Sequence, residues 1–161
     1  MAIIVVSDLH LGFDGSDKAA FIRFLGKLQS DPSVTDLVFL GDIVDMWRRD
    51  SSGVFLENHD VLDLIIELQK KMRVYYVAGN HDFHVLKLQG LGYPINFNMD
   101  LKLQQDGVNC RLFTAGSLTR CRGSTSWNRS ATQCLIRRAN ATITFGPLLV
   151  VTKVTCLAFS P

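Results

Sequence analysis

Three short polar motifs each follow an apolar run along this chain, and together they limit the folds it can adopt. The runs are short and apolar, as buried strands are, and the first is β-branched throughout: Ile3–Val6, Leu37–Leu40 and Val74–Val77. Each is followed directly by its motif: Asp8-Leu9-His10, Gly41-Asp42-Ile43-Val44-Asp45 and Gly79-Asn80-His81-Asp82. Ligands of open α/β sheets bind outside the carboxyl ends of the strands. We therefore expect the three motifs to meet at one edge of a sheet.

The segments between these runs have helical spacing. Asp17 can cap a helix that buries one apolar face and ends at Asp31-Pro32-Ser33, and the face comprises Phe21, Phe24, Leu25 and Leu28. The segment from Val54 to Met72 predicts one further helix, with Val61, Leu62, Ile65, Ile66 and Leu68 buried. This alternation of strands and helices predicts an α/β fold built on a parallel sheet.

The chain changes character near residue 106. Asn96–Leu103 alternates and runs into Gln105-Asp106-Gly107, which predicts a β-hairpin. Residues 1–106 carry 10 basic and 15 acidic side chains, whereas residues 107–161 carry seven basic and no acidic ones. The formal charges are therefore −5 and +7. We expect residues 1–106 to form the N-terminal part of a domain, and residues 107–161 to be an atypical basic segment.

No segment of the chain predicts export or a membrane span. Met1-Ala2 leads directly into the first strand, without the basic region and cleavage site of a signal peptide. The longest apolar stretch, Phe145–Phe159, is interrupted by Lys153 and is shorter than the ~18 residues that a span needs. A cytoplasmic protein is the expectation.

The residue types of the motifs suit a divalent metal. Asp8 and His10 are two apart, so both side chains can point to one side of an extended chain. Asp42 can bridge two metals, Asn80 offers a neutral oxygen, and Asp45 can orient a ligand without binding the metal itself. Either of the first two motifs alone would also fit an ordinary turn with a solvated aspartate.

The third motif adds acid–base groups. His81 is the natural proton donor for a leaving oxygen, and Asp82 can hold its imidazole in the useful tautomer. Carboxylate, imidazole and amide ligands together select manganese, iron or zinc. This set predicts metal-assisted attack of water on a phosphate ester.

These residues resemble the D-x-H, G-D-x-x-D and G-N-H-D motifs of the calcineurin-like metallophosphoesterase superfamily, over roughly residues 1–106. The resemblance implies an α/β/β/α sandwich around two divalent ions, with Mn²⁺ expected and Fe, Zn or Ni as alternatives. It implies that Asp8 and His10 bind the first ion, that Asp42 bridges both and that Asn80 binds the second. His81 would be the catalytic histidine, with a metal-activated hydroxide as the nucleophile.

A basic and aromatic run follows the second motif. Trp47, Arg48 and Arg49 could grip a nucleotide or a second phosphate, or they could form an ordinary capped loop with exposed arginines. With a tryptophan shortly after the second motif, the chain resembles the branch of the family that hydrolyses UDP-2,3-diacylglucosamine. The expected substrate is therefore a phosphorylated small molecule or a nucleotide-linked one. A nuclease or cyclic-nucleotide phosphodiesterase of the same superfamily is the second enzyme hypothesis.

The later motifs of the family, which supply three more histidines, have no counterpart here, because the histidines are His10, His59, His81 and His84. We hypothesise that the basic segment is read out of frame. Codons permitted for Thr114–Asn128, read one base earlier, can spell H-G-G-E-F-D-A-V-Q-G-V-D-F-L-E. As written, the fold is expected to be incomplete at its C-terminus and the activity impaired. The non-enzyme alternative is an inactive module whose basic segment contacts nucleic acid or acidic surfaces.

Overall fold

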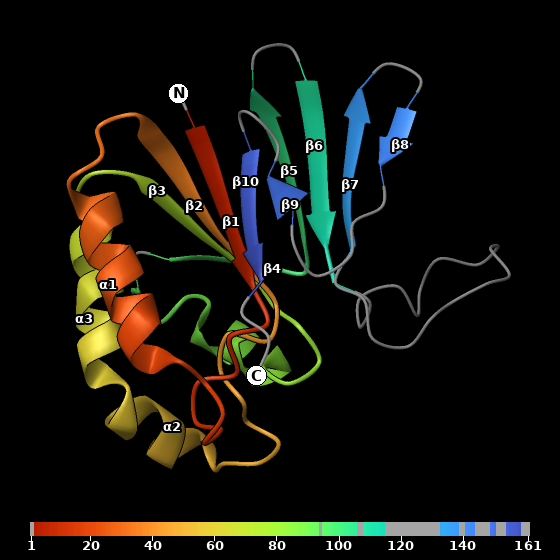
Figure 1. Cartoon of the computed structure of the whole chain (residues 1–161). Coiled ribbons are helices and arrows are strands. Elements are labelled where there is room, and N and C mark those ends of the chain that lie inside the picture. The colour runs from red at the N-terminus through yellow and green to blue at the C-terminus, as the bar shows by residue number, and fades with distance from the viewer. Residues whose placement is uncertain are drawn as a thin grey trace, which may run out of the picture.

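Figure 1 presents a computed structural model of the chain, in which two β-sheets lie side by side and helices line the outer face of the first. The structure describes residues 2–93, 95–105, 108–114, 133–138, 141–143, 149–150 and 154–158. Its helices are α1 (Lys18–Gln29), α2 (Ser51–Glu57), α3 (His59–Leu68) and the 3₁₀ helix η1 (Phe83–Leu88). Its strands are β1 (Ala2–Ser7), β2 (Val34–Leu40), β3 (Arg73–Val77), β4 (Asn96–Asn98), β5 (Asp100–Gln105), β6 (Val108–Phe113), β7 (Gln133–Arg138), β8 (Ala141–Ile143), β9 (Leu149–Val150) and β10 (Val154–Ala158).

The first sheet has the strand order β4-β3-β2-β1-β10-β9, and its only antiparallel pair joins β9 to β10. β1 lies between β2 and β10, with Ile3 opposite Asp36 on one side and Val154 on the other. The second sheet has the order β5-β6-β7-β8 and is antiparallel throughout. The predicted α/β fold with a parallel sheet is confirmed, and so are the three predicted strands.

Two hydrophobic cores hold these layers together, since alternate residues of a strand face opposite sides of the sheet. One core lies between the first sheet and the helices and includes Val6, Phe39, Phe21, Leu25 and Ile65. The other lies between the two sheets, where side chains of the first sheet meet Leu101 and Leu112 of the second, and its first-sheet members are Ile3, Val5, Val38, Leu40 and Val77. The described residues thus form an α/β/β arrangement, and no described helix covers the outer face of the second sheet.

The first predicted helix is confirmed. The side chain of Asp17 accepts a 2.8 Å hydrogen bond from the backbone N–H of Ala20 and caps α1. Phe21, Leu25 and Leu28 are buried as predicted. The helix ends at Gln29, before Asp31.

The second predicted helix is wrong as a single element, because α2 and α3 divide at Asn58. The buried amide of Asn58 donates 2.7 Å to the carbonyl oxygen of Val54, and its backbone N–H bonds to Phe55, which ends α2. Ile66, predicted to be buried, is 38% exposed. A polar side chain that satisfies the helix terminus therefore redirects the chain at a point where the apolar spacing is uninterrupted.

The alternating segment Asn96–Leu103 contributes one strand to each of the two sheets. Its first residues form β4 beside β3, and from Asp100 the chain continues as β5 in the second sheet. β5 and β6 form the predicted hairpin, with Gln105 opposite Val108. Residues 106–107 of its turn lie outside the described residues.

Strands beyond residue 106 join both sheets, since β6 pairs with β5 and β10 pairs with β1. The division of the chain at residue 106 stays a prediction. In the part of the chain that the structure describes, no helix is long and apolar enough to cross a bilayer.

Candidate metal centre and its two histidines

The loops that follow β1, β2 and β3 come together through their backbones. The amide of Asp8 donates to the carbonyl of Gly41 (3.2 Å), and the amide of His10 donates to the carbonyl of Asp42 (2.9 Å). The third loop joins them where the amide of Met46 donates to the carbonyl of His81 (3.1 Å). The three motifs therefore meet at one edge of the sheet, as their positions after the strands predicted.

Three of the predicted metal ligands have unusual backbone conformations. Asp8, His10 and Asp42 have φ angles of 56°, 52° and 56°, in the left-handed region that residues other than glycine seldom adopt. Such conformations cost about 1–3 kcal/mol each, and they concentrate at functional sites. The backbone hydrogen bonds between the loops hold these three residues in place.

Glycine lets two of the motifs approach closely. A Cβ atom on Gly79 would lie 2.3 Å from Oδ1 of Asp42 and 2.7 Å from its backbone nitrogen. A Cβ on Gly41 would lie 3.2 Å from Cα of Gly79 and 2.5 Å from Cγ2 of Thr114. The second and third motifs thus touch backbone to backbone, and position 114 lies against them.

The first group that could hold a cation comprises Asp8, His10 and Asp42, whose ligand atoms lie within 4.8 Å of one another. Burial raises the pKa of Asp42, and the negative charge of Asp8 adds to that shift. The hydrogen bond from the backbone N–H of His81 (2.9 Å) opposes it. Two carboxylates this close to an imidazole form a donor set that suits a divalent ion.

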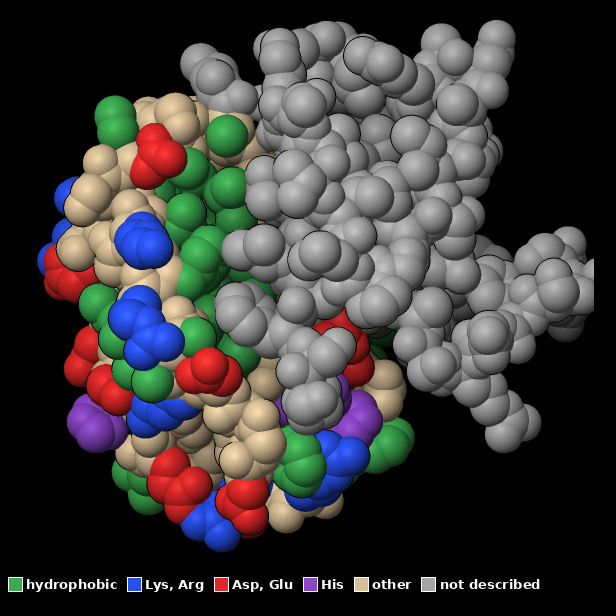
Figure 2. Space-filling model, viewed as in Figure 1, with side chains coloured by type: hydrophobic (Ala, Val, Ile, Leu, Met, Phe, Trp, Pro, Cys, Tyr) green, Lys and Arg blue, Asp and Glu red, His purple; other side chains and the backbone are tan. Residues whose placement is uncertain are grey.

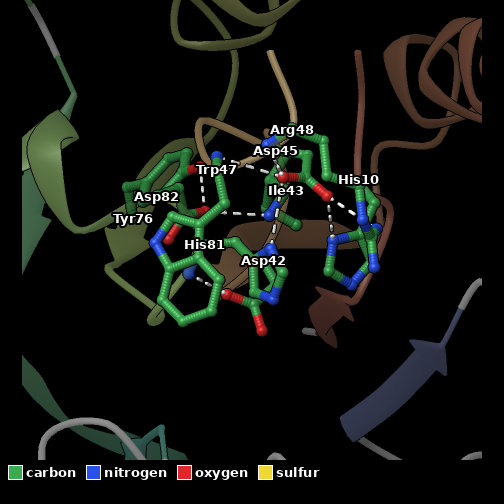
Figure 3. A network of polar contacts seen from close by, with 9 residues as sticks. All are labelled: His10, Asp42, Ile43, Asp45, Trp47, Arg48, Tyr76, His81 and Asp82. Carbon is green, nitrogen blue, oxygen red and sulfur yellow. Dashed lines mark hydrogen bonds and ion pairs between the residues drawn. The ribbon is translucent and has the colours of Figure 1, made fainter. Parts of the chain in front are cut away.

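Asp45 links the two histidines of the site (Figure 3). Its side chain is fully buried, with one oxygen 3.2 Å from Nδ1 of His81 and the other 3.4 Å from Nδ1 of His10. Asp45, His10 and His81 form the second group whose ligand atoms lie within 4.8 Å. The sequence predicted that Asp45 orients a metal ligand without binding the metal. In the structure its carboxylate lies against the imidazoles of His10, a predicted ligand, and of His81.

The charge of Asp45 is balanced from its own loop. Nη1 of Arg48 lies 2.8 Å from Oδ2, and Oδ1 accepts hydrogen bonds from the backbone N–H groups of Trp47 (3.1 Å) and Arg48 (3.0 Å). Burial by itself raises the pKa of Asp45, but these hydrogen bonds and His81 together hold that pKa below its ordinary value. The carboxylate is therefore charged at neutral pH.

The imidazole of His81 is enclosed by rings as well as by Asp45. The indole of Trp47 stacks on it, with ring centroids 4.3 Å apart and an interplanar angle of 28°. The ring of His10 meets it edge-on at 4.8 Å and 84°. His81 is half-buried, whereas Trp47 is 68% exposed.

Asp82 does not have the predicted contact with His81. Its carboxylate is fully buried and accepts three hydrogen bonds, from the backbone N–H groups of Gly79 (2.6 Å) and Ile43 (2.8 Å) and from the hydroxyl of Tyr76 (2.6 Å). Nδ1 of His81 faces Asp45 instead. Asp82 therefore links the third motif to the second, because its carboxylate accepts backbone N–H groups from both.

Tyr76 was not among the predicted site residues. It lies in β3 and is buried, and burial raises the pKa of its hydroxyl well above the ordinary value, so the group keeps its proton and donates a hydrogen bond to Asp82. The one signal in the sequence was the pair Tyr75-Tyr76 inside a strand predicted to be buried, since a buried hydroxyl needs a partner.

The remaining predicted site residues are at the surface. Both arginines have partners, because Arg48 contacts Asp45 and lies over the ring of Phe13 at 4.5 Å, while Arg49 pairs with Glu57. Asn80 is exposed between the buried Gly79 and the half-buried His81. In Figure 2, histidine side chains lie beside acidic ones at the lower right of the described part.

Comparisons with known proteins agree with this geometry. The calcineurin-like phosphoesterase family matches residues 1–141. A UDP-2,3-diacylglucosamine hydrolase from Shewanella piezotolerans is 36% identical over 84 residues, which are 52% of this chain and 34% of that protein. A second, from Pectobacterium carotovorum, is 33% identical over 89 residues, 54% of this chain and 36% of the relative. The chain thus spans about a third of the length of the curated relatives it matches.

Among solved structures, a protein of unknown function from Aquifex aeolicus aligns with a TM-score of 0.46 and 19% identity. The alignment covers 71% of this chain and 61% of that one. The family match covers all three motifs and most of the sequence. The chain therefore belongs to the calcineurin-like phosphoesterase family.

Proposed function

We propose that the chain hydrolyses phosphate mono-, di- or pyrophosphate esters with the help of two divalent ions. The observation that carries the proposal is the convergence of Asp8, His10 and Asp42, which come from two loops, beside the pair of Asp45 and His81. Family membership implies divalent metal ions in general.

The residues fit such ions. Among the described residues, the buried Nδ1 of His10 has no hydrogen-bond partner, although a carboxylate oxygen of Asp45 lies 3.4 Å away. Asp8, His10 and Asp42 would hold one ion, and Asp42 and Asn80 would hold the second. Mn²⁺ suits this mixture of oxygen and nitrogen donors. When bound, the two ions would lower the pKa of water and neutralise charge on the phosphate.

The other residues have positional or acid–base roles in this proposal. His81 would donate a proton to the leaving oxygen. Asp45, which faces Nδ1 of His81, favours a proton on that nitrogen and would stabilise the imidazolium form, whose Nε2–H is the proton given to the leaving oxygen. Asp82 would keep Gly79 and Ile43 in register, so that the loops carrying Asp42 and Asn80 stay in contact.

A nucleotide-linked pyrophosphate is the substrate class we propose. Its support is the likeness to hydrolases named for UDP-2,3-diacylglucosamine and the pair Arg48-Arg49 in the loop that carries Asp45. Because Asp45 and Glu57 fix the two guanidinium groups, Arg48 and Arg49 would act as fixed positive charges toward a phosphate.

The experiment compares two substrates with Mn²⁺ present: bis-p-nitrophenyl phosphate, a generic phosphodiester, and a UDP-sugar, a nucleotide-linked pyrophosphate. We expect hydrolysis that chelation abolishes and that His81→Asn lowers at least tenfold, with the UDP-sugar preferred. His84→Asn is the control, since His84 is exposed and outside the site. Equal rates for the His81→Asn variant and the unmodified chain would refute the proposed role of His81.

We further propose that the activity of this chain is impaired because its second ion has too few ligands. Position 114 bears on the frame hypothesis. Thr114 is buried, and its hydroxyl donates to the carbonyl of Ala78 (2.9 Å) beside Gly41 and Gly79. In the alternative frame the peptide begins with a histidine at this position, and that histidine would lie next to the loops of Asp42 and Asn80.

The DNA tests the frame hypothesis directly. We expect sequencing from the codon of Leu101 onward to reveal an alternative frame with two further histidine-glycine motifs. A correction of one base should then restore metal-dependent hydrolysis. If no frame encodes such motifs, the basic segment is genuine and the hypothesis is rejected.

A further inference from the structure

The stack between Trp47 and His81 is unusual because the tryptophan is largely exposed. Two-thirds of its side-chain surface faces solvent, yet one face of the indole covers the imidazole at a centroid distance of 4.3 Å. Exposed aromatic side chains have many rotamers available, so a parallel arrangement with a functional ring needs a reason. Figure 3 shows the indole lying along the imidazole of His81.

The segment from Asp45 to Trp47 contacts His81 at three places. The carboxylate of Asp45 faces Nδ1 at 3.2 Å, the backbone N–H of Met46 donates to the carbonyl of His81 at 3.1 Å, and the indole of Trp47 covers the ring face. The edge of His10 closes another side. One short segment therefore restrains the backbone, one nitrogen and the plane of this histidine.

We infer that Trp47 is a positioning residue that fixes the ring plane of His81, and this inference rests on the proposed role of His81 in hydrolysis. The contact with Asp45 alone would still let the imidazole rotate about the line that joins Nδ1 to the carboxylate oxygen. A flat indole against the face of the ring opposes that rotation. Together they keep Nδ1 at the carboxylate and Nε2 available for proton transfer.

This inference differs from the substrate-gripping role that the sequence suggested for Trp47. The face of the indole that lies on His81 is not available to a nucleobase. Loss of a gripping residue weakens binding and raises KM, whereas loss of a positioning residue lowers kcat. Misplacement of a catalytic group by about 1 Å lowers rates roughly a hundredfold.

The first experiment observes the imidazole directly. We would record proton–nitrogen correlation spectra of the four histidine rings in the full chain at one fixed pH, and assign His81 by its loss in His81→Asn. We expect a single tautomer with the proton on Nδ1, and carbon-bound ring protons shifted upfield by the indole. Trp47→Leu should abolish that shift and give mixed tautomers, while Trp47→Phe should largely retain both features.

Tyr93→Leu is the matched control, because Tyr93 is also an exposed aromatic residue and has no ring contact with His81 among the described contacts. It should leave the His81 signals unchanged. A Trp47→Leu spectrum in which His81 keeps its single tautomer would overturn the inference, whether or not the chain is active.

Kinetics with bis-p-nitrophenyl phosphate and Mn²⁺ give the second measurement. We expect Trp47→Leu to lower kcat about tenfold to a hundredfold with little change in KM, and Trp47→Phe to restore most of kcat. A rise in KM at constant kcat would assign Trp47 to substrate binding instead. If His81→Asn retained activity, the proposed function would fail, while the spectra would still decide whether Trp47 fixes the ring.

Discussion

The hydroxyl of Tyr76 donates a 2.6 Å hydrogen bond to the buried carboxylate of Asp82. The same carboxylate accepts the backbone N–H of Ile43 in the second motif and that of Gly79 in the third. One side chain therefore satisfies donors from two loops and from the strand between them. Buried polar groups of this kind are costly to leave without a partner, and this network should contribute strongly to the stability of the site.

We predict that Asp82→Asn lowers the free energy of unfolding by about 2–4 kcal/mol, because an amide group would face a backbone N–H donor. Tyr76→Phe should lower it by about 1–2 kcal/mol. Urea denaturation followed by circular dichroism measures both. Tyr93→Phe, which removes an exposed hydroxyl, should change it by less than about 0.5 kcal/mol. Equal effects of the two tyrosine variants would contradict the network.

The buried contacts of Asp82 also show where sequence reasoning succeeded and where it did not. Strands β1, β2 and β3 were predictable because strands buried on both faces are continuous apolar runs. Which aspartate faces His81 depends on how two loops fold against each other, and spacing alone does not determine that. Asp82 is adjacent to His81 in sequence, yet Asp45, 36 residues away, makes the contact.

Two features of the fold also escaped the sequence prediction. The break at Asn58 arises from one side-chain hydrogen bond to Val54, which periodicity does not register. The alternation of Asn96–Leu103 continues across a change of sheet, since both sheets bury alternate residues. The first is a local side-chain hydrogen bond and the second is a change of strand partner, and hydrophobic spacing reveals neither.

Asp45 offers a prediction about the two histidines. Asp45→Asn removes the charge that faces Nδ1 of both His10 and His81, and it leaves Arg48 without its buried partner. Residues that orient metal ligands typically contribute 10–100-fold to activity or metal affinity. We expect kcat on bis-p-nitrophenyl phosphate with Mn²⁺ to fall within that range. Asp63→Asn, on the exposed face of α3, should leave kcat unchanged, and a similar fall for both variants would point to a general charge effect.

Gly79 supplies a steric test of the metal centre. Gly79→Ala places a Cβ within 2.3 Å of Oδ1 of Asp42, so the proposed bridging ligand must move. We expect Mn²⁺ affinity, measured by isothermal titration calorimetry, to fall at least tenfold.

The control for Gly79 is another glycine. Gly26→Ala in α1 meets nothing within 4 Å and should stabilise the helix by about 0.5–1 kcal/mol without altering Mn²⁺ binding. If Gly79→Ala bound Mn²⁺ as tightly as the unmodified chain, Asp42 would not be a ligand in its present position.

Position 114 provides the strongest test of an incomplete ligand set. Thr114 is buried against Ala78 and Gly41, next to the loops that carry Asp42 and Asn80. A histidine there would bring a further imidazole to the proposed second ion, which otherwise has only two ligands. We predict that Thr114→His raises Mn²⁺ affinity roughly tenfold or more, equivalent to about 1.4 kcal/mol of binding free energy per factor of ten.

Thr114→Val separates ligand gain from loss of the hydroxyl, because it removes the hydrogen bond to Ala78 at nearly constant volume. Titration calorimetry of both variants and the unmodified chain should place Thr114→His alone at higher affinity, and Mn²⁺-dependent hydrolysis should rise with it. Equal affinities for the histidine and valine variants would mean that position 114 cannot reach the ion. The shortage of ligands would then lie elsewhere in the chain, and a histidine restored here by a change of frame would not explain it.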